Sequence, residues 1–119
     1  MKPELEFFST AEVRWTVVPG GIAGLTERIL ATDERTGVAT RMLRFAPGTD
    51  TTPAGAQEHD FWEEVCIIEG SLHDLTLERT FTAGMYACRP PGMRHGPWTS
   101  PGGCLTFEVR YTEGAQRAT

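Results

Sequence analysis

The segment GMYACRPPGMRH, residues 84–95, contains the most restrictive pattern in the chain. Residues 85–89 are typical of a short strand, and Pro90-Pro91-Gly92 ends it because proline cannot donate to a β-ladder. The stiffened backbone turns there, shortly before His95. His95 is one of only three histidines in 119 residues, so its position behind this turn makes it a candidate metal ligand.

A second group of metal-capable side chains lies in GAQEHDFWEEVCIIEG, residues 55–70. Gln57 and His59 are two residues apart, so in an extended chain they project to the same face. Glu63 follows four residues later, a spacing that suits a bend and a return to that face. Two imidazoles, one carboxylate and one amide oxygen would suit a borderline divalent metal.

The remaining sequence indicates short strands with little helix between them. Residues 25–31, 38–45 and 104–111 alternate apolar and polar side chains, as strands do. Shorter strands are expected at 15–18, 65–69, 72–77 and 80–82, a helical turn at 10–13, a loop at 49–55 and a frayed tail at 114–119. About eight short strands at regular spacing predict an all-β, antiparallel sandwich or barrel.

Length and charge limit the function classes. A chain of 119 residues predicts one domain, residues 1–119. The net charge of -5 argues against nucleic-acid binding. We expect no membrane span and no signal peptide, because there is no long apolar run. Three separated cysteines without a C-x-x-C pair predict reduced thiols and a cytoplasmic protein.

Together, the two segments resemble the paired motifs of the cupin superfamily, a jelly-roll β-barrel. The second motif falls on Gly84, Pro90, Gly92 and His95 without adjustment, and the first falls on Gly55, Gln57, His59, Glu63 and Gly70 with a shortened first gap. The resemblance covers about residues 38–111. It is similar to small single-domain cupins and to the cupin domain of ChrR-type anti-sigma factors.

The resemblance implies one divalent transition metal, with Fe(II) as first choice and Mn, Ni or Zn also compatible with the ligands. Its ligands would be Gln57, His59, Glu63 and His95. Gln57 stands where the family has its first histidine, so it is either a weak ligand or a hydrogen-bond partner of the ligands. Glu64 competes with Glu63 for the carboxylate position.

Five residues near the motifs are expected to line a substrate pocket: Arg41, Trp62, Arg89, Trp98 and Phe107. The aromatic side chains could instead pack in the core. The arginines could instead pair with Glu108 or Glu64, because a buried cation needs a partner. His73 has no place in either motif and is expected at the surface.

The first functional hypothesis is a dioxygenase that cleaves a C–C bond in a small oxygenated substrate, such as a β-diketone, a hydroxyketone or an aromatic diol. The second is a redox-neutral isomerase, cyclase or decarboxylase that works through an enolate held by the metal. The third is a non-enzymatic sensor or binding module, although 119 residues leave no room for the sigma-binding region of ChrR-type proteins. A homodimer is expected, with the segment at residues 15–18 in the contact.

Overall fold

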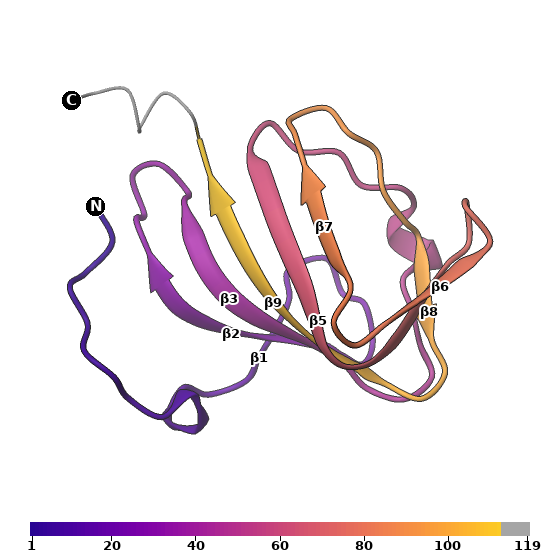
Figure 1. Cartoon of the computed structure of the whole chain (residues 1–119), viewed down its shortest axis with the longest axis horizontal. Helices are drawn as coiled ribbons and strands as arrows, with labels where there is room; N and C mark the ends of the chain where they lie inside the picture. Colours follow the sequence, from indigo (N-terminus) through magenta and orange to yellow (C-terminus); the bar gives the residue numbers. More distant parts are fainter. Residues whose placement is uncertain (113–119) are drawn as a thin grey trace.

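The computed structural model describes residues 1–112, which are built almost entirely from strands (Figure 1). Two single-turn 3-10 helices, η1 (Thr10–Glu12) and η2 (Thr52–Ala54), are the helical elements of this part. Its nine strands are β1 (Thr16–Val17), β2 (Leu25–Thr32), β3 (Ala39–Phe45), β4 (Thr49–Asp50), β5 (Trp62–Asp74), β6 (Arg79–Thr82), β7 (Tyr86–Arg89), β8 (Trp98–Ser100) and β9 (Cys104–Tyr111). Every pairing between them is antiparallel.

The long strand β5 joins two sheets that curl toward each other (Figure 1). Its first half pairs with β9 on one edge and β7 on the other, and β9 continues through β3 and β2 to β1. Its second half pairs with β6 and β8, and β8 carries β4. The predicted antiparallel β-barrel architecture is confirmed.

Gly70 allows β5 to pass from one sheet to the other. Its φ of 77° lies in the left-handed region, and the pairing with β9 shifts register just before it, between Ile67 and Glu69. A β-carbon at this position would lie 2.1 Å from the carbonyl oxygen of Gly103. That oxygen also accepts a hydrogen bond from the backbone N–H of Ser71, so it cannot move away freely.

The interior changes from apolar to charged along the strands. At one end, a hydrophobic cluster contains Leu43, Phe45, Ile67, Leu72 and Cys104. Toward the other end, the same inward faces of β3, β5 and β9 carry ionisable residues, namely Arg41, Glu63 and Glu108, all buried. Arg41, Leu43 and Phe45 share the buried face of β3. The charged end is where the two motif segments meet.

Some strand predictions need correction. The strands expected at 65–69 and 72–77 are one strand that ends at Asp74. The Asp74 carboxylate accepts the backbone N–H groups of Thr76 and Leu77, which fixes a turn in place of further strand. The strands β4 and β8, two and three residues long, were not predicted because they are too short to show an alternating pattern. The expected tail at 114–119 lies outside the described residues.

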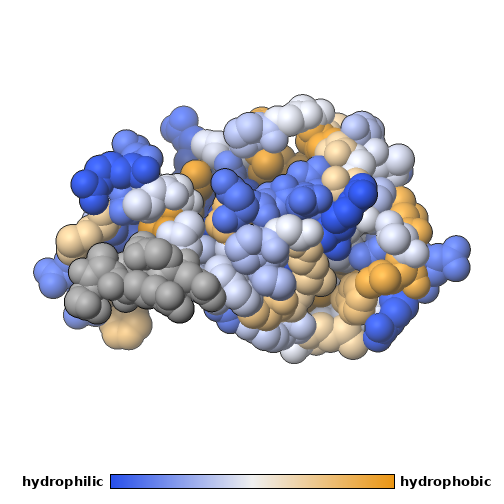
Figure 2. Space-filling model, turned by 90° about the horizontal axis from the view of Figure 1, so that it is seen from above, coloured by the Kyte–Doolittle hydropathy of each residue, from blue (hydrophilic) through white to orange (hydrophobic). Residues whose placement is uncertain are grey.

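The N-terminal residues run along the outside of the sheet. The terminal ammonium group of Met1 contacts Asp33, and Lys2 donates a hydrogen bond to Thr40. Phe7 and Val17 are exposed in this segment. Figure 2 shows hydrophobic residues interspersed among hydrophilic ones on the face seen from above. Within residues 1–112, we find no helix that is long and apolar enough to cross a membrane.

A Gly70→Ala substitution is expected to destabilise the fold more than Gly84→Ala. Gly84 also has a positive φ, 89°, but its β-carbon would meet open space, so that variant isolates the backbone cost of about 1–2 kcal/mol. Gly70→Ala adds the clash with Gly103. Urea unfolding followed by circular dichroism measures both losses, and equal losses would contradict the close approach as the reason for glycine at 70.

Candidate metal centre

Three predicted ligands meet at the charged end of the barrel. One ligand atom from each of His59, Glu63 and His95 lies within 4.8 Å of the other two. Glu63 lies near the start of β5, His59 lies in the loop before it, and His95 lies in the loop between β7 and β8. Two loops and a strand therefore bring together residues up to 36 positions apart in the sequence (from 59 to 95).

Backbone hydrogen bonds hold the two loops together. The N–H of Gln57 donates to the carbonyl of His95 at 2.7 Å, and the N–H of His95 donates back at 3.0 Å. The N–H of Gly92 donates to the carbonyl of His59 at 2.8 Å. Each histidine is thus positioned by a residue of the other motif. The side-chain amide nitrogen of Gln57 donates to the carbonyl of Ala54, and its role as a metal ligand stays a prediction.

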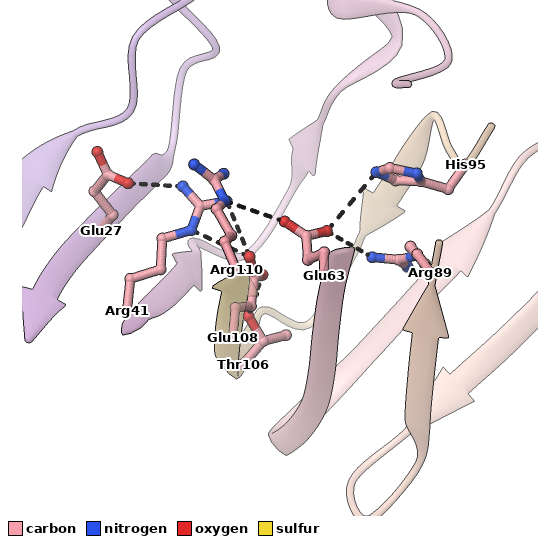
Figure 3. Close-up of polar contacts among 8 residues, drawn as sticks. All are labelled: Glu27, Arg41, Glu63, Arg89, His95, Thr106, Glu108 and Arg110. Carbon is pink, nitrogen blue, oxygen red and sulfur yellow. Dashed lines mark hydrogen bonds and ion pairs between the residues drawn. The ribbon is translucent and has the colours of Figure 1, made fainter. Parts of the chain in front are cut away.

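The Glu63 carboxylate lies between two arginines (Figure 3). Arg89 on β7 and Arg110 on β9 are its direct cross-strand neighbours. Arg89 Nη1 donates to Glu63 Oε1 at 3.1 Å, and Arg110 Nε donates to Oε2 at 3.3 Å. Burial alone would raise the pKa of Glu63, but the charges of Arg110, Arg89 and Arg41 outweigh it and hold the pKa below its usual value. The carboxylate is therefore ionised at neutral pH.

Both histidines are held neutral. Burial, together with the charge of Arg89, lowers the pKa of His95 to about 4. Burial also lowers the pKa of His59, and the Glu63 carboxylate offsets only part of this effect. The His59 ring stacks on Phe61, with ring centroids 4.6 Å apart, which fixes its orientation. Two neutral imidazoles can offer lone pairs at neutral pH.

This donor set fits a divalent transition metal. Imidazole nitrogen and carboxylate oxygen suit Fe, Mn, Ni and Zn, and two histidines with one carboxylate form the facial arrangement that leaves further positions open. His95 Nε2 lies 3.9 Å from Glu63 Oε1, so the two groups already converge. We therefore describe His59, Glu63 and His95 as a candidate metal centre.

A second set of ion pairs lies on the side of Glu63 away from His95 (Figure 3). Arg41 Nη1 contacts Glu27 at 2.7 Å and Arg41 Nη2 contacts Glu108 at 2.9 Å, with all three residues buried. Thr106 donates to the other oxygen of Glu108 at 2.8 Å. Arg41 is thus engaged between two carboxylates, and its predicted place in a substrate pocket stays a prediction.

A cavity of about 440 Å³ opens beside the centre. His95, Arg89 and Trp98 lie in its wall. The rest of its wall is mainly apolar, with Val65, Ile67, Leu72, Leu77, Phe81, Met85, Ala87 and Met93. A cavity of this volume with such a wall is typical of a site that binds a small, largely apolar molecule.

Two predicted pocket residues lie on the outer face of the sheet. Trp62 stacks on Tyr111, with ring centroids 6.1 Å apart. Phe107 alternates with the buried Thr106 and Glu108, so its side chain points outward and it is 37% exposed. Neither contributes to the wall of this cavity, and a role in substrate binding stays a prediction for both. Arg89 and Trp98 lie in the wall of this cavity, and their contact with a substrate stays a prediction.

Side-chain direction separates Glu64 and His73 from the centre. Glu64 lies on the opposite face of β5 from Glu63 and accepts a hydrogen bond from Tyr86. His73 is bonded to Thr80 and is not part of the candidate centre. The cysteines Cys66, Cys88 and Cys104 are all free, as predicted.

Two contributors to the charged end were not predicted from the sequence. Glu27 pairs with Arg41, and Arg110 pairs with Glu63, and the sequence pattern indicates neither contact. The alternation of 104–111 places Arg110 on the same face as Glu108, which was the available signal for an inward cation. The contact with Glu63 depends on the register between β5 and β9, which alternation does not determine.

Comparisons with known proteins agree with this fold. The family model of the ChrR Cupin-like domain matches residues 4–112. An acetylacetone dioxygenase from Acinetobacter johnsonii is 18% identical, with a TM-score of 0.68 over 90% of this chain and 72% of that chain. The polyketide cyclase RemF from Streptomyces resistomycificus is 19% identical, with a TM-score of 0.71 over 90% and 79%. A chain in the complex of SigE with the anti-sigma ChrR from Rhodobacter sphaeroides is 23% identical, with a TM-score of 0.63 over 84% and 50%. No curated protein matches.

In the metal-free protein, the imidazole of His95 is expected to titrate near pH 4 instead of near 6.5. The unfolded chain then binds the proton more readily between these two values, so this group makes stability rise with pH through that window. NMR of the ring Cε1–H signals after chelator treatment measures the midpoint. A midpoint near 6.5 would contradict the burial and the Arg89 charge described here.

Proposed function

Because this chain belongs to the ChrR cupin-like family, we propose that it is a metal-dependent cupin enzyme for a small oxygenated substrate. The reaction we favour is dioxygenase-type C–C cleavage of a β-dicarbonyl or related compound. In such a cleavage both atoms of O2 enter the products, so no further reductant is needed. The observation that carries the proposal is the convergence of His59, Glu63 and His95 beside an apolar cavity.

Each residue has a distinct part in this proposal. His59, Glu63 and His95 would hold the metal, with Gln57 as a fourth, weaker donor. A divalent metal such as Fe(II), or else Mn, Ni or Zn, would supply Lewis acidity to the substrate oxygens and a binding position for O2. The apolar wall excludes water from the reacting atoms, and Trp98 offers an aromatic surface against the substrate.

The resemblance to an acetylacetone dioxygenase supports this choice at the level of fold. A redox-neutral isomerase, cyclase or decarboxylase is the second candidate. It is favoured by Gln57, whose neutral amide binds a metal less firmly than the histidine of the family motif, and by the resemblance to a polyketide cyclase.

A sensor or binding module is the third candidate, and the match to the ChrR Cupin-like family and the likeness to the ChrR complex favour it. Binding of a metal or small molecule without turnover would distinguish it from both enzymes. The proposal also places the protein in the cytoplasm, which the three free thiols suit.

We expect the Fe(II)-loaded protein to consume O2 with a β-diketone, and His95→Ala or Glu63→Ala to lower metal content at least tenfold because each removes a ligand. His73→Ala is the matched control, since His73 lies outside the centre. Elemental analysis and an oxygen electrode measure both results. Full metal content in His95→Ala would show that the site is wrong. Product formation without O2 uptake would favour the redox-neutral candidate.

We also propose a homodimer formed by the β1 edges of two copies. In the described part of the chain, β1 pairs only with β2, so its other edge is open. Val17, on β1, is 69% exposed and would be covered by such a contact.

A Val17→Asp substitution is expected to convert the dimer into a monomer, because it places a charge in the proposed contact. Size-exclusion chromatography with light scattering measures the mass. Leu75→Asp, at an exposed position in the turn after β5, serves as the control and should leave the mass unchanged. A wild-type mass equal to one chain would refute the dimer.

A further inference from the structure

The Arg89 side chain lies in the cavity wall, and its guanidinium has N–H donors to spare for a ligand. It is the last residue of β7, its side chain is 12% exposed, and it lies in the cavity wall together with His95. Nη1 donates to Glu63. Within residues 1–112, neither Nε nor Nη2 of Arg89 has a hydrogen-bond partner, and neither is sealed from solvent. These two nitrogens form the side of the guanidinium that matches a carboxylate with two parallel hydrogen bonds.

The charges around the cavity favour an anion. Glu63 is shared between Arg89 and Arg110, so it does not neutralise both cations. Asp74 is the carboxylate in the cavity wall, and it is occupied by the backbone N–H groups of the turn that follows β5. Arg94, also in the wall, adds positive charge near the surface, where it is exposed.

The other residues of the cavity wall favour a ligand with an apolar body. The Arg89 guanidinium lies over the Trp98 ring, 5.3 Å from its centroid. Trp98 meets Phe81 edge to face at 6.5 Å, and Leu72 continues this surface. A charge-assisted hydrogen bond is strengthened in such surroundings because water does not compete for the donor. The cavity therefore places the Arg89 guanidinium, with two parallel N–H donors, at the end of an apolar space.

We propose that the substrate of this site is the anion of an apolar carboxylic acid, with its carboxylate on Nε and Nη2 of Arg89 and its body against Trp98. The inference rests on the proposed function and adds a carboxylate group to the small oxygenated substrate proposed there. Arg89 Nη1 and His95 Nε2 lie 3.1 Å and 3.9 Å from the same oxygen of Glu63. A carboxylate on Arg89 thus places the neighbouring carbon atoms of the substrate beside the candidate metal centre.

The test uses the full chain treated with chelator, so that metal plays no part. Isothermal titration at pH 7 compares 3-phenylpropionate with its neutral analogue 3-phenylpropanamide. We expect the acid to bind at least tenfold more tightly than the amide in the wild-type protein. In Arg89→Met the preference should fall below twofold. Arg35→Met, which removes a remote and exposed cation, should keep it.

Two further variants make the result decisive. Arg89→Lys keeps the charge but loses the fork, so it should retain part of the preference even if Arg89→Met fails to fold. Arg94→Met tests whether the exposed arginine is responsible instead. Equal binding of acid and amide, or a preference that survives Arg89→Met and is lost in Arg94→Met, would overturn the proposal. Failure of the metal proposal would appear separately, in the metal content and O2 uptake.

Discussion

The ionised Glu63 carboxylate is the interaction on which the site depends. It is only 3% exposed, and an unpaired charge at such a depth would be strongly unfavourable. Its direct neighbours on β7 and β9 are both arginines, so the sheet supplies its counterions by register alone. Burial, together with the charge of Arg89, keeps His95 neutral, so Arg89 favours the metal-binding form of both Glu63 and His95.

This arrangement explains why one end of the barrel is charged. Two groups of ion pairs lie there. Arg41 pairs with Glu27 and Glu108, and Glu63 pairs with Arg89 and Arg110, so the two groups together span β2, β3, β9, β5 and β7. Removing one partner of such a buried pair typically costs about 3–5 kcal/mol, whereas an exposed pair contributes about 1 kcal/mol or less. A single substitution at the charged end is therefore costly, and the apolar cluster near Gly70 supplies the ordinary hydrophobic core.

Much of this could be predicted from sequence, for identifiable reasons. Alternation in 38–45 and 104–111 indicated the strands and their faces, and motif spacing selected His59, Glu63 and His95. Contacts between strands could not be predicted, because register is set by distant pairings that leave no local pattern. Motif spacing did not show that Trp62 and Phe107 lie on the outer face, since an aromatic residue near a motif can lie on either face of its strand. The strands β4 and β8 were too short to give any periodic signal.

The length of β5 has a consequence for cooperativity. This strand carries Glu63 at one end, contributes Ile67 and Leu72 to the core, and pairs with four other strands. Local opening around the centre would therefore disturb both sheets at once, and we expect the site and the core to unfold in one transition. A ligand that binds the native state adds RT ln(1 + [L]/Kd) to the free energy of unfolding. Any compound that binds in the cavity is consequently expected to raise the melting temperature of the whole barrel.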